Sequence, residues 1–248
     1  MFSSLQHIPS IARESLPHLT TSQMIEVDRL MMEEFGIQLI QMMENAGRNL
    51  ADLAQAMLDG EILDRPLLVL AGRGNNGGGG LVAARHLANR GAEVQVVLAR
   101  AIEQFQGAPA QQLDILLTMG VSVMEAGDGW ELPSADLIID ALIGYGLVDH
   151  PRGTTASLIQ LANSHPAPIL SLDAPSGLNV TTGQRCHPCI QADATLTLAL
   201  PKTGLFASPE VVGELYLADI SAPPILFEAL DIALPPIFTS SPILKIAR

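Results

Sequence analysis

The sequence predicts an α/β protein: a Rossmann-like three-layer α/β/α sandwich with a mostly parallel central sheet and two extra N-terminal helices. Three observations predict this class. Short runs of aliphatic and β-branched residues alternate with segments of helical spacing from residue 66 onward. The runs are apolar on both faces, as in parallel strands covered by helices on two sides. A glycine-rich segment, GRGNNGGGG at residues 72–80, follows the first of them.

Two helices are expected before the sheet. Residues 1–18 show no sustained period and are expected to form an N-terminal arm. Thr20 and Gln23 then have the spacing of a capping box, and Gly36 is expected to end the helix that they start. Its apolar positions recur at helical spacing: Met24, Val27, Met31 and Phe35. The second helix has its own apolar face: Leu39, Met42, Ala46, Leu50, Leu53 and Met57.

The sheet and its helices follow in alternation, which indicates βα units. Strands are expected at residues 67–71, 93–99, 121–125, 136–143, 168–174, 194–200 and 214–220. Helices are expected at residues 80–90, 107–118 and 154–164. A chain of 248 residues can bury one sizeable core. We therefore predict one domain over residues 19–225, with the Pro-rich residues 226–248 as a tail packed on it.

Composition excludes some classes of partner. Thirteen basic against 26 acidic residues give a net charge of −13, which repels nucleic acids at long range. No apolar run reaches the roughly 18 residues that would cross a bilayer, and the N-terminus lacks the pattern of a signal peptide. A cytoplasmic protein is expected, with neither a nucleic-acid nor a membrane partner. Cys186 and Cys189 supply only two of the four ligands of a structural zinc site, so we interpret them as an incidental loop pair, with redox or metal roles as alternatives.

The glycine segment has the pattern G-x-G-x-x-G between a strand and a helix, where backbone N–H groups and the helix dipole favour an anion. A dinucleotide dehydrogenase also needs an acidic residue at the end of the second strand, about 20 residues on. That strand ends instead at Arg100, and Glu93 lies at its start, which disfavours hydride transfer. Asn75 and Asn76 add side-chain amides, which we interpret as ligand contacts rather than as turn formers only.

Carboxylates end two of the predicted strands. Asp140 and Asp173 each follow an apolar run, and ligands of a parallel sheet collect at the carboxyl ends of its strands. A buried carboxylate is costly unless it meets a cation or a proton. The turn Asp173-Ala-Pro-Ser176-Gly177 is expected to aim Asp173 and Ser176 into one space, and residues 144–146 form a second bare loop on the same rim.

These motifs carry a family resemblance. They are Met24-x-x-x-Asp28, MENAG (43–47), GRGNNGGGG, DALIGYGL, SLDAPSG and ADATLTLALPKTGL. In this order the chain resembles the YjeF N-terminal domain, the NAD(P)H-hydrate epimerase family, from about Leu19 to Ile220. The resemblance implies an often dimeric enzyme that interconverts the R and S forms of 6-hydroxylated NADH and NADPH. It also implies coupling to a separate ATP- or ADP-dependent dehydratase, which a chain ending at Arg248 is not expected to contain.

The resemblance also assigns site residues. It implies substrate contacts from Asn75, Asn76, Gly77, Gly78, Gly79, Gly144, Tyr145, Gly146, Leu147, Val148, Asp149, His150 and Asp173. It implies a potassium ion on Asn76, Asp140 and Ser176, whose oxygens suit a hard cation. Inversion at carbon 6, by loss and return of water or by ring opening and closing, needs a proton carrier, and Asp173 is the expected general acid/base. Lys202 is expected to form a structural pair or to be exposed, rather than to bind a phosphate.

The chain departs from the family at two places. Gly79 stands where the family loop NNGGDG has an aspartate, so a hydrogen-bond acceptor is lost and lower affinity or turnover is expected. The end of the last strand reads LADIS where a GDIG-like end is common. The alternative is therefore a non-catalytic nucleotide-binding or protein-interaction module of the same fold. Retention of polar groups for one cavity favours the epimerase: Asn76, Asp140, Asp173 and Ser176.

Overall fold

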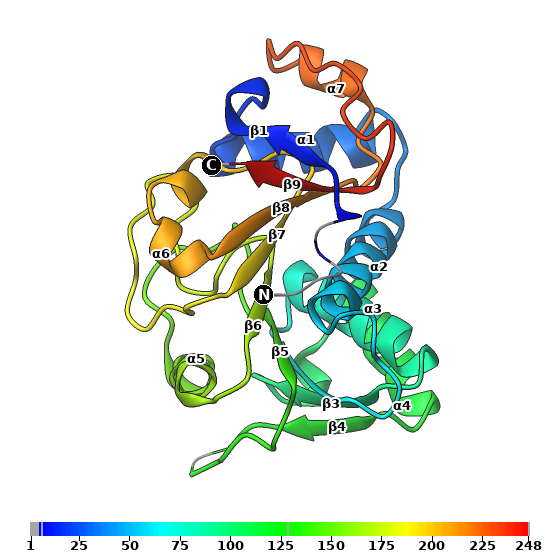
Figure 1. Ribbon diagram of the computed structural model, residues 1–248, viewed down its shortest axis with the longest axis vertical. Coiled ribbons are helices and arrows are strands. Elements are labelled where there is room, and N and C mark those ends of the chain that lie inside the picture. The colour runs from blue at the N-terminus through cyan, green and yellow to red at the C-terminus, as the bar shows by residue number, and fades with distance from the viewer. Residues whose placement is uncertain (1–4, 6, 128, 248) are drawn as a thin grey trace.

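The computed structural model describes residues 5, 7–127 and 129–247. Within them a nine-stranded sheet has the order β1-β9-β8-β7-β6-β5-β2-β3-β4, with helices on both faces (Figure 1). The strands are β1 (Ser10–Ala12), β2 (Pro66–Ala71), β3 (Glu93–Leu98), β4 (Ser122–Glu125), β5 (Leu137–Ala141), β6 (Ile169–Leu172), β7 (Ala194–Leu198), β8 (Glu214–Ala218) and β9 (Ile243–Ala247). The helices are α1 (Thr21–Glu33), α2 (Leu39–Met57), α3 (Asn75–Asn89), α4 (Gly107–Thr118), α5 (Gly153–Ser164), α6 (Pro209–Val212) and α7 (Pro224–Glu228).

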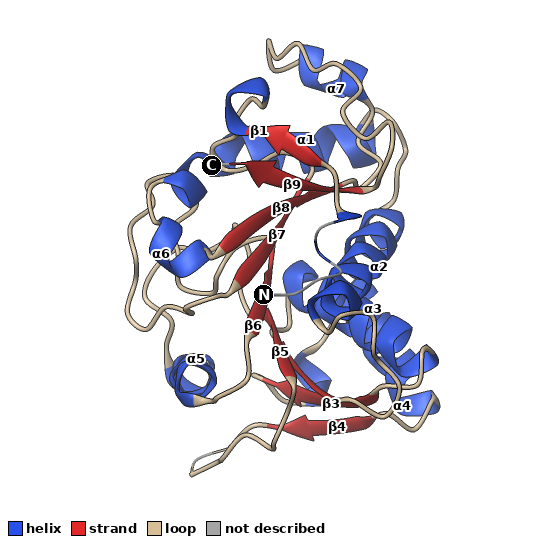
Figure 2. Ribbon diagram, viewed as in Figure 1, coloured by secondary structure: helices blue, strands red, loops and turns tan. Residues whose placement is uncertain are grey.

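The expected α/β class is confirmed by the layers. Helices α2, α3 and α4 lie on one side of the sheet and α5 lies on the other (Figure 2). Leu53 of α2 and Leu81 of α3 share a core with Val69 of β2. Ile159 of α5 packs in a separate core with Ile138 of β5. Because β2 and β5 are buried along almost their whole length, their apolar runs carry no alternation.

The two helices expected before the sheet are also confirmed. In the capping box at the start of α1, the Gln23 amide donates to Thr20 Oγ1 over 3.3 Å, and the Thr20 amide donates to Gln23 Oε1 over 2.9 Å. Met31 of α1 belongs to a core that includes Leu217 of β8 and Phe227 of α7. None of the helices within the described residues combines the length and apolar character needed to cross a bilayer.

Strand order places a topological switch point between β2 and β5. The chain runs outward from β2 to β3 and β4, returns to β5 beside β2, and continues outward in the other direction through β6, β7 and β8. These strands are mutually parallel, so their carboxyl ends lie at one edge. Ligands of doubly wound sheets bind in the crevice at such a point. Residues 72–76 and 142–146 follow β2 and β5 and lie there.

Helix α3 begins at Asn75, so the expected start at residue 80 was wrong. Glycine is a poor helix former, but close packing requires it in this first turn. A Cβ on Gly77 would lie 1.7 Å from the Gly72 carbonyl oxygen, and one on Gly80 would lie 2.4 Å from Ala141 Cβ. Tertiary contact with the ends of β2 and β5 therefore overrides local propensity.

Two edge strands come from segments that the sequence suggested were an arm and a tail. Strand β9 pairs antiparallel with β8, and β1 pairs parallel with β9. Both ends of the chain thus contribute to one edge of the sheet, while the proposed domain boundaries themselves stay predictions. These strands had no local signal, because β1 has three residues and β9 finds its partners only through long-range pairing.

Candidate active site

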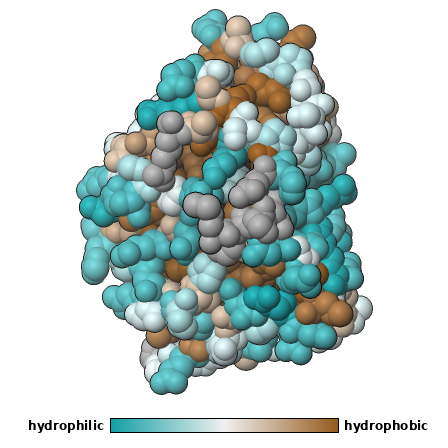
Figure 3. All heavy atoms as spheres, in the orientation of Figure 1, coloured by the Kyte–Doolittle hydropathy of each residue, from teal (hydrophilic) through white to brown (hydrophobic). Residues whose placement is uncertain are grey.

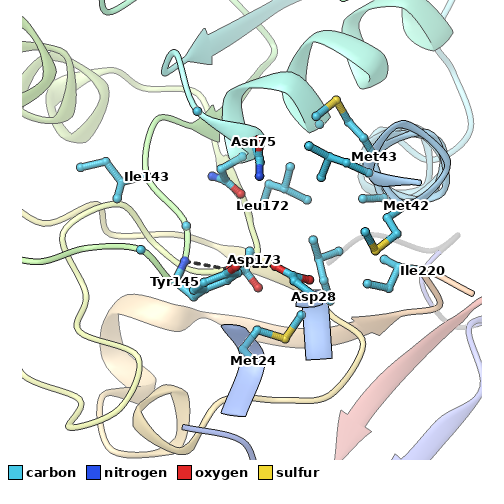
Figure 4. A pocket seen from close by; sticks show the side chains of 18 of the residues that line it. Met24, Asp28, Met42, Met43, Asn75, Ile143, Tyr145, Leu172, Asp173 and Ile220 are labelled. Carbon is cyan, nitrogen blue, oxygen red and sulfur yellow. Dashed lines mark hydrogen bonds between the residues drawn. The ribbon is translucent and has the colours of Figure 1, made fainter. Parts of the chain in front are cut away.

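A cavity of about 330 Å³ opens at the switch point, between the carboxyl ends of the central strands and helices α1 and α2 (Figure 4). Its polar lining comprises Asp28, Asn75, Asn76, Tyr145 and Asp173. Three methionines from α1 and α2 form much of the opposing apolar wall: Met24, Met42 and Met43. Methionine side chains adapt to flat or irregular ligands. The cavity therefore combines converging polar groups with a deformable apolar surface.

The bare loop after β5 brings the polar groups together. A Cβ on Gly144 would lie 2.9 Å from Asn76 Oδ1 and 3.0 Å from Asp173 Oδ2. Only a residue without a side chain lets the backbone lie against both groups. Asp173 itself has φ +66°, the left-handed region that aspartate tolerates better than most residues. This conformation, just after β6, belongs to the turn that presents the carboxylate to the cavity.

Asp173 is held by a buried ion pair. Lys202 Nζ lies 2.5 Å from Asp173 Oδ1. The Tyr145 amide donates to Asp173 Oδ2 over 2.9 Å (Figure 4). Lys202 is fully buried, and its ammonium also donates to the Leu198 carbonyl oxygen over 2.9 Å. The expectation that Lys202 forms a structural pair is thereby confirmed. Lys202 does not line the cavity, so its charge acts on Asp173 from behind.

Asp140 and Ser176 form a second buried polar group beside the cavity. The Asp140 carboxylate accepts hydrogen bonds from Ser176 Oγ (2.6 Å), Ser171 Oγ (2.8 Å), Ser176 N (2.9 Å) and Leu142 N (3.2 Å). Complete burial raises the pKa of Asp140, against the effect of these hydrogen bonds. Among the residues that the structure describes, no cation pairs with this carboxylate. In its ionised form this carboxylate is therefore hydrogen-bonded but not neutralised by a cation.

These groups fit the chemistry of a potassium ion. Ser176 Oγ also contacts the Ile143 carbonyl oxygen at 3.2 Å, so carboxylate, hydroxyl and carbonyl oxygens lie together. Asn76 lines the adjoining cavity, and its side-chain amide supplies a further oxygen of this kind. Oxygen donors around an uncompensated buried charge are the set that a hard cation accepts.

The cavity contains part of the predicted substrate set. The predicted residues that line it are Asn75, Asn76, Gly79, Gly144, Tyr145, Gly146 and Asp173. Gly77 and Gly78 belong to α3 and face the protein instead, Gly77 toward Gly72 and Gly78 toward Met43. The structure does not bring Leu147 and Val148 into the cavity, and Val148 is 96% exposed.

The last two residues of that loop lie elsewhere. Asp149 and His150 line a separate surface hollow together with Arg100 and Arg152. Asp149 pairs with Arg152 there, and the His150 ring Nδ1 accepts from the His187 amide over 2.8 Å. The loop after β5 thus connects the cavity to the surface, and only its first half contributes to the cavity.

Asp28 is a site residue that the sequence reasoning did not assign. It lines the cavity from α1 and accepts a hydrogen bond from the Tyr145 hydroxyl (Figure 4). Burial raises the pKa of Asp28. The available signal was its position: Asp28 is one turn after Met24 and next to Val27, so a carboxylate interrupts the apolar face of this helix.

The C-x-x-C segment supports the turn that carries Ser176. The Cys186 amide donates to the Gly177 carbonyl oxygen over 2.8 Å, and the Ile190 amide donates to the Ser176 carbonyl oxygen over 2.9 Å. Both cysteines are unpaired. Burial raises the pKa of the Cys189 thiol to about 12, so it is a thiol at neutral pH. These contacts give the segment a packing role.

Leu172 occupies the space beside Gly79. A Cβ added to Gly79 would lie 2.7 Å from Leu172 Cδ2, and no other atom would come within 4 Å. Leu172, the residue that precedes Asp173 in the sequence, also lines the cavity. The position where the family has an aspartate is therefore covered by an aliphatic side chain.

Comparisons with known proteins agree with this geometry. A family model described as YjeF-related protein N-terminus matches residues 39–204. The chain is 42% identical to an NAD(P)H-hydrate epimerase of Dehalogenimonas lykanthroporepellens, covering 86% of both chains. It is 36% identical to an NAD(P)H-hydrate epimerase of Rhodopirellula baltica, covering 84% of this chain and 86% of that one.

Two further relatives differ in length or origin. The chain is 40% identical to the bifunctional NAD(P)H-hydrate repair enzyme Nnr of Moorella thermoacetica, covering 83% of this chain but only 40% of that protein. The crystal structure of yeast ynu0 superimposes with a TM-score of 0.82 at 26% identity, covering 93% of this chain and 100% of that one. By its sequence and its fold, the chain belongs to the YjeF-related N-terminal family.

Proposed function

We propose that this protein is an NAD(P)H-hydrate epimerase, which interconverts the R and S forms of 6-hydroxylated NADH and NADPH. One observation carries the proposal: the ion-paired carboxylate of Asp173 faces a cavity at the switch point, beside the start of α3. Relatives that are named NAD(P)H-hydrate epimerase align over most of this chain. The non-catalytic alternative is not favoured, because a module that only binds has no use for a costly buried ion pair aimed into a cavity.

The start of α3 is suited to the substrate's phosphates. Its N-cap, Gly74, makes no side-chain capping bond, so the first N–H groups of the helix are free to meet an anion. Gly74, Asn75 and Asn76 all line the cavity. The altered nicotinamide ring then lies against the methionine wall, within reach of Asp173. In this arrangement Asp173 is the group that takes or gives a proton at the oxygen on carbon 6.

A potassium ion held by Asn76, Asp140 and Ser176 is part of this proposal. When bound, it supplies a positive charge beside the substrate's phosphates. Asp140 provides the negative charge, while Ser176 and the Asn76 amide provide neutral ligands. We expect a higher melting temperature in potassium chloride than in choline chloride of equal ionic strength, because ligand binding to the native state stabilises it. Equal melting temperatures, or the same difference in Ser176→Ala, would contradict this site.

The proposal extends to the protein's context. We place the protein in the cytoplasm, as a homodimer whose product passes to a dehydratase that consumes one epimer.

The test uses one isolated epimer of NADH hydrate in potassium buffer, with chromatography to follow the other. We expect conversion well above the spontaneous rate. No excess over the spontaneous rate would remove the enzyme assignment. The matched variant is Asp173→Asn, which keeps the shape of the side chain and removes its charge. If Asp173→Asn is as fast as the wild type, the role of Asp173 is wrong and the epimerase assignment remains.

A further inference from the structure

The cavity holds a second carboxyl group, Asp28, to which the proposed function gives no task. Asp28 projects from α1 into the same space as Asp173, which comes from the turn after β6 (Figure 4). Both side chains contact the same residue. The Tyr145 amide donates to Asp173 Oδ2 over 2.9 Å, and its hydroxyl donates to Asp28 Oδ2. Tyr145 therefore sets the positions of both carboxyl groups.

The two carboxyl groups have different electrostatic surroundings. Asp173 forms an ion pair with Lys202, whereas Asp28 has no ion pair among the described residues. On its own helix, the neighbouring Arg29 is committed to Glu26 and Glu33. Asp28 therefore depends on hydrogen bonding alone, with no cation paired to it in the part of the chain that the structure describes.

The direction of the pKa shift at Asp28 agrees with this difference. Burial raises the pKa of Asp28, and so does the negative charge of Asp173. The hydrogen bond from Tyr145 and the charge of Lys202 lower the pKa of Asp28, but burial has the larger effect. Burial and the charge of Asp28 also raise the pKa of Tyr145, so its hydroxyl stays protonated and remains a donor. Two carboxyl groups held in unlike environments are the usual arrangement for paired acid and base roles.

We propose that Asp28 is a second catalytic residue of the epimerase: it protonates the hydroxyl group that leaves carbon 6, while Asp173 deprotonates the water that returns. This inference rests on the proposed function. Tyr145 is a positioning residue, which orients Asp28 through its hydroxyl and Asp173 through its amide. Such a division suits inversion, because departure and return take place on opposite faces of carbon 6 and two carboxyl groups can serve the two steps separately.

The proposed steps balance. The bond between carbon 6 and oxygen breaks with its electron pair on oxygen, and the lone pair of ring nitrogen 1 forms a double bond to carbon 6. The oxygen takes the proton of Asp28 and departs as water, which leaves Asp28 ionised. Water then adds to the other face, the double-bond pair returns to nitrogen, and Asp173 takes the released proton. One proton passes back from Asp173 to Asp28 through water, and the reverse reaction exchanges the two roles.

The decisive variant is Asp28→Asn, which keeps an acceptor for the Tyr145 hydroxyl and removes the proton. We expect kcat to fall by about 10²- to 10⁴-fold, the usual effect of losing general acid catalysis, with KM nearly unchanged. The pH profile of kcat/KM should also lose its alkaline limb, which reports deprotonation of the acid. The matched control is Glu33→Gln on the same helix, an exposed carboxylate paired with Arg29, which should behave as wild type.

Tyr145→Phe provides a second measurement that depends less on Asp28 itself. It removes only the hydroxyl, so we expect a smaller fall in kcat and a shifted alkaline limb. Wild-type kcat and pH profile in Asp28→Asn would overturn the inference and leave the epimerase assignment intact. An inactive wild-type protein would instead remove the proposed function, and this inference with it. Circular dichroism on each variant separates loss of activity from loss of fold. If Asp28→Asn is misfolded, Tyr145→Phe decides. An unshifted pH profile of kcat/KM in Tyr145→Phe would then contradict the proposal.

Discussion

Asp173 and Lys202 show what single residues contribute to this site. Both side chains are buried, so removing one partner leaves a charge without compensation. We expect Lys202→Met to lower the free energy of unfolding by about 3–5 kcal/mol and to reduce turnover, since the charge on Asp173 is no longer held in place. Urea denaturation measures the first effect. Lys245→Met is the control, because Lys245 and Glu214 form a partly exposed pair worth about 1 kcal/mol or less. Similar losses in both variants would contradict the importance of burial.

Gly79 and Leu172 pack against each other beside the cavity. Gly79→Asp restores the acceptor that the family carries, but its Cβ would lie 2.7 Å from Leu172 Cδ2. We expect a loss of about 1 kcal/mol in the free energy of unfolding, at the lower end of overpacking effects, because only the end of the Leu172 side chain must move aside. Gly79→Asp combined with Leu172→Val should lose less than the sum of the single variants, because the two positions share one space. Strictly additive losses in denaturation experiments would show that Gly79 and Leu172 do not share one space.

The junction between β2 and α3 fixes the position of the glycine loop that lines the site. A Cβ on Gly77 would lie 1.7 Å from the backbone oxygen of Gly72, so the loop and the helix cannot both keep their places. We expect Gly77→Ala to destabilise the protein by about 3 kcal/mol, at the upper end of overpacking effects. Gly74→Ala is the matched control, because its Cβ would meet no atom within 4 Å. Thermal unfolding compares them, and equal melting temperatures would mean that the start of α3 adjusts freely.

Strands from both ends of the chain, β1 and β9, form one edge of the sheet and so affect the stability of the whole molecule. In β9, Ile246 is buried in the core and the next residue, Ala247, is exposed. We expect Ile246→Asp to cost more than about 3 kcal/mol in the free energy of unfolding, from lost apolar burial and a buried charge. Ala247→Asp adds the same charge one position along and should stay within about 0.5 kcal/mol of wild type. Equal stabilities would mean that β9 is dispensable for the fold.

The surface of the whole molecule carries the proposed dimer. The face in Figure 3 is mostly hydrophilic, and apolar side chains gather in its upper part, where α7 lies. Helix α1 packs against α7, and large apolar side chains are exposed on α1 (Ile25 and Met32), just after it (Phe35) and on α7 (Ile225). We propose that these exposed side chains form the contact between two copies, since exposed apolar patches mark interfaces. Sedimentation velocity should give a dimer for the wild type and a monomer for Ile25→Glu. A monomeric wild type, or a dimeric variant, contradicts this placement.

The sequence by itself determined the two N-terminal helices, the central strands of the sheet and the edge of the sheet at which the site lies. Apolar periodicity, the capping box at Thr20 and the polar ends of β5 and β6 depend on residues only a few positions apart, and parallel strands place their carboxyl ends at one edge. Those signals therefore predicted the α/β class and the position of Asp140 and Asp173 at that edge.

Only the tertiary structure decided which side chains meet at that edge. Asp28 and Tyr145 are 117 positions apart, and Lys202 is 29 positions from Asp173. The start of α3 at Asn75, the pairing of β1 with β9 and the exposure of Val148 likewise depend on contacts between distant segments. Such contacts leave no periodic trace, because each is set by how the finished layers pack and not by the conformational preferences of neighbouring residues.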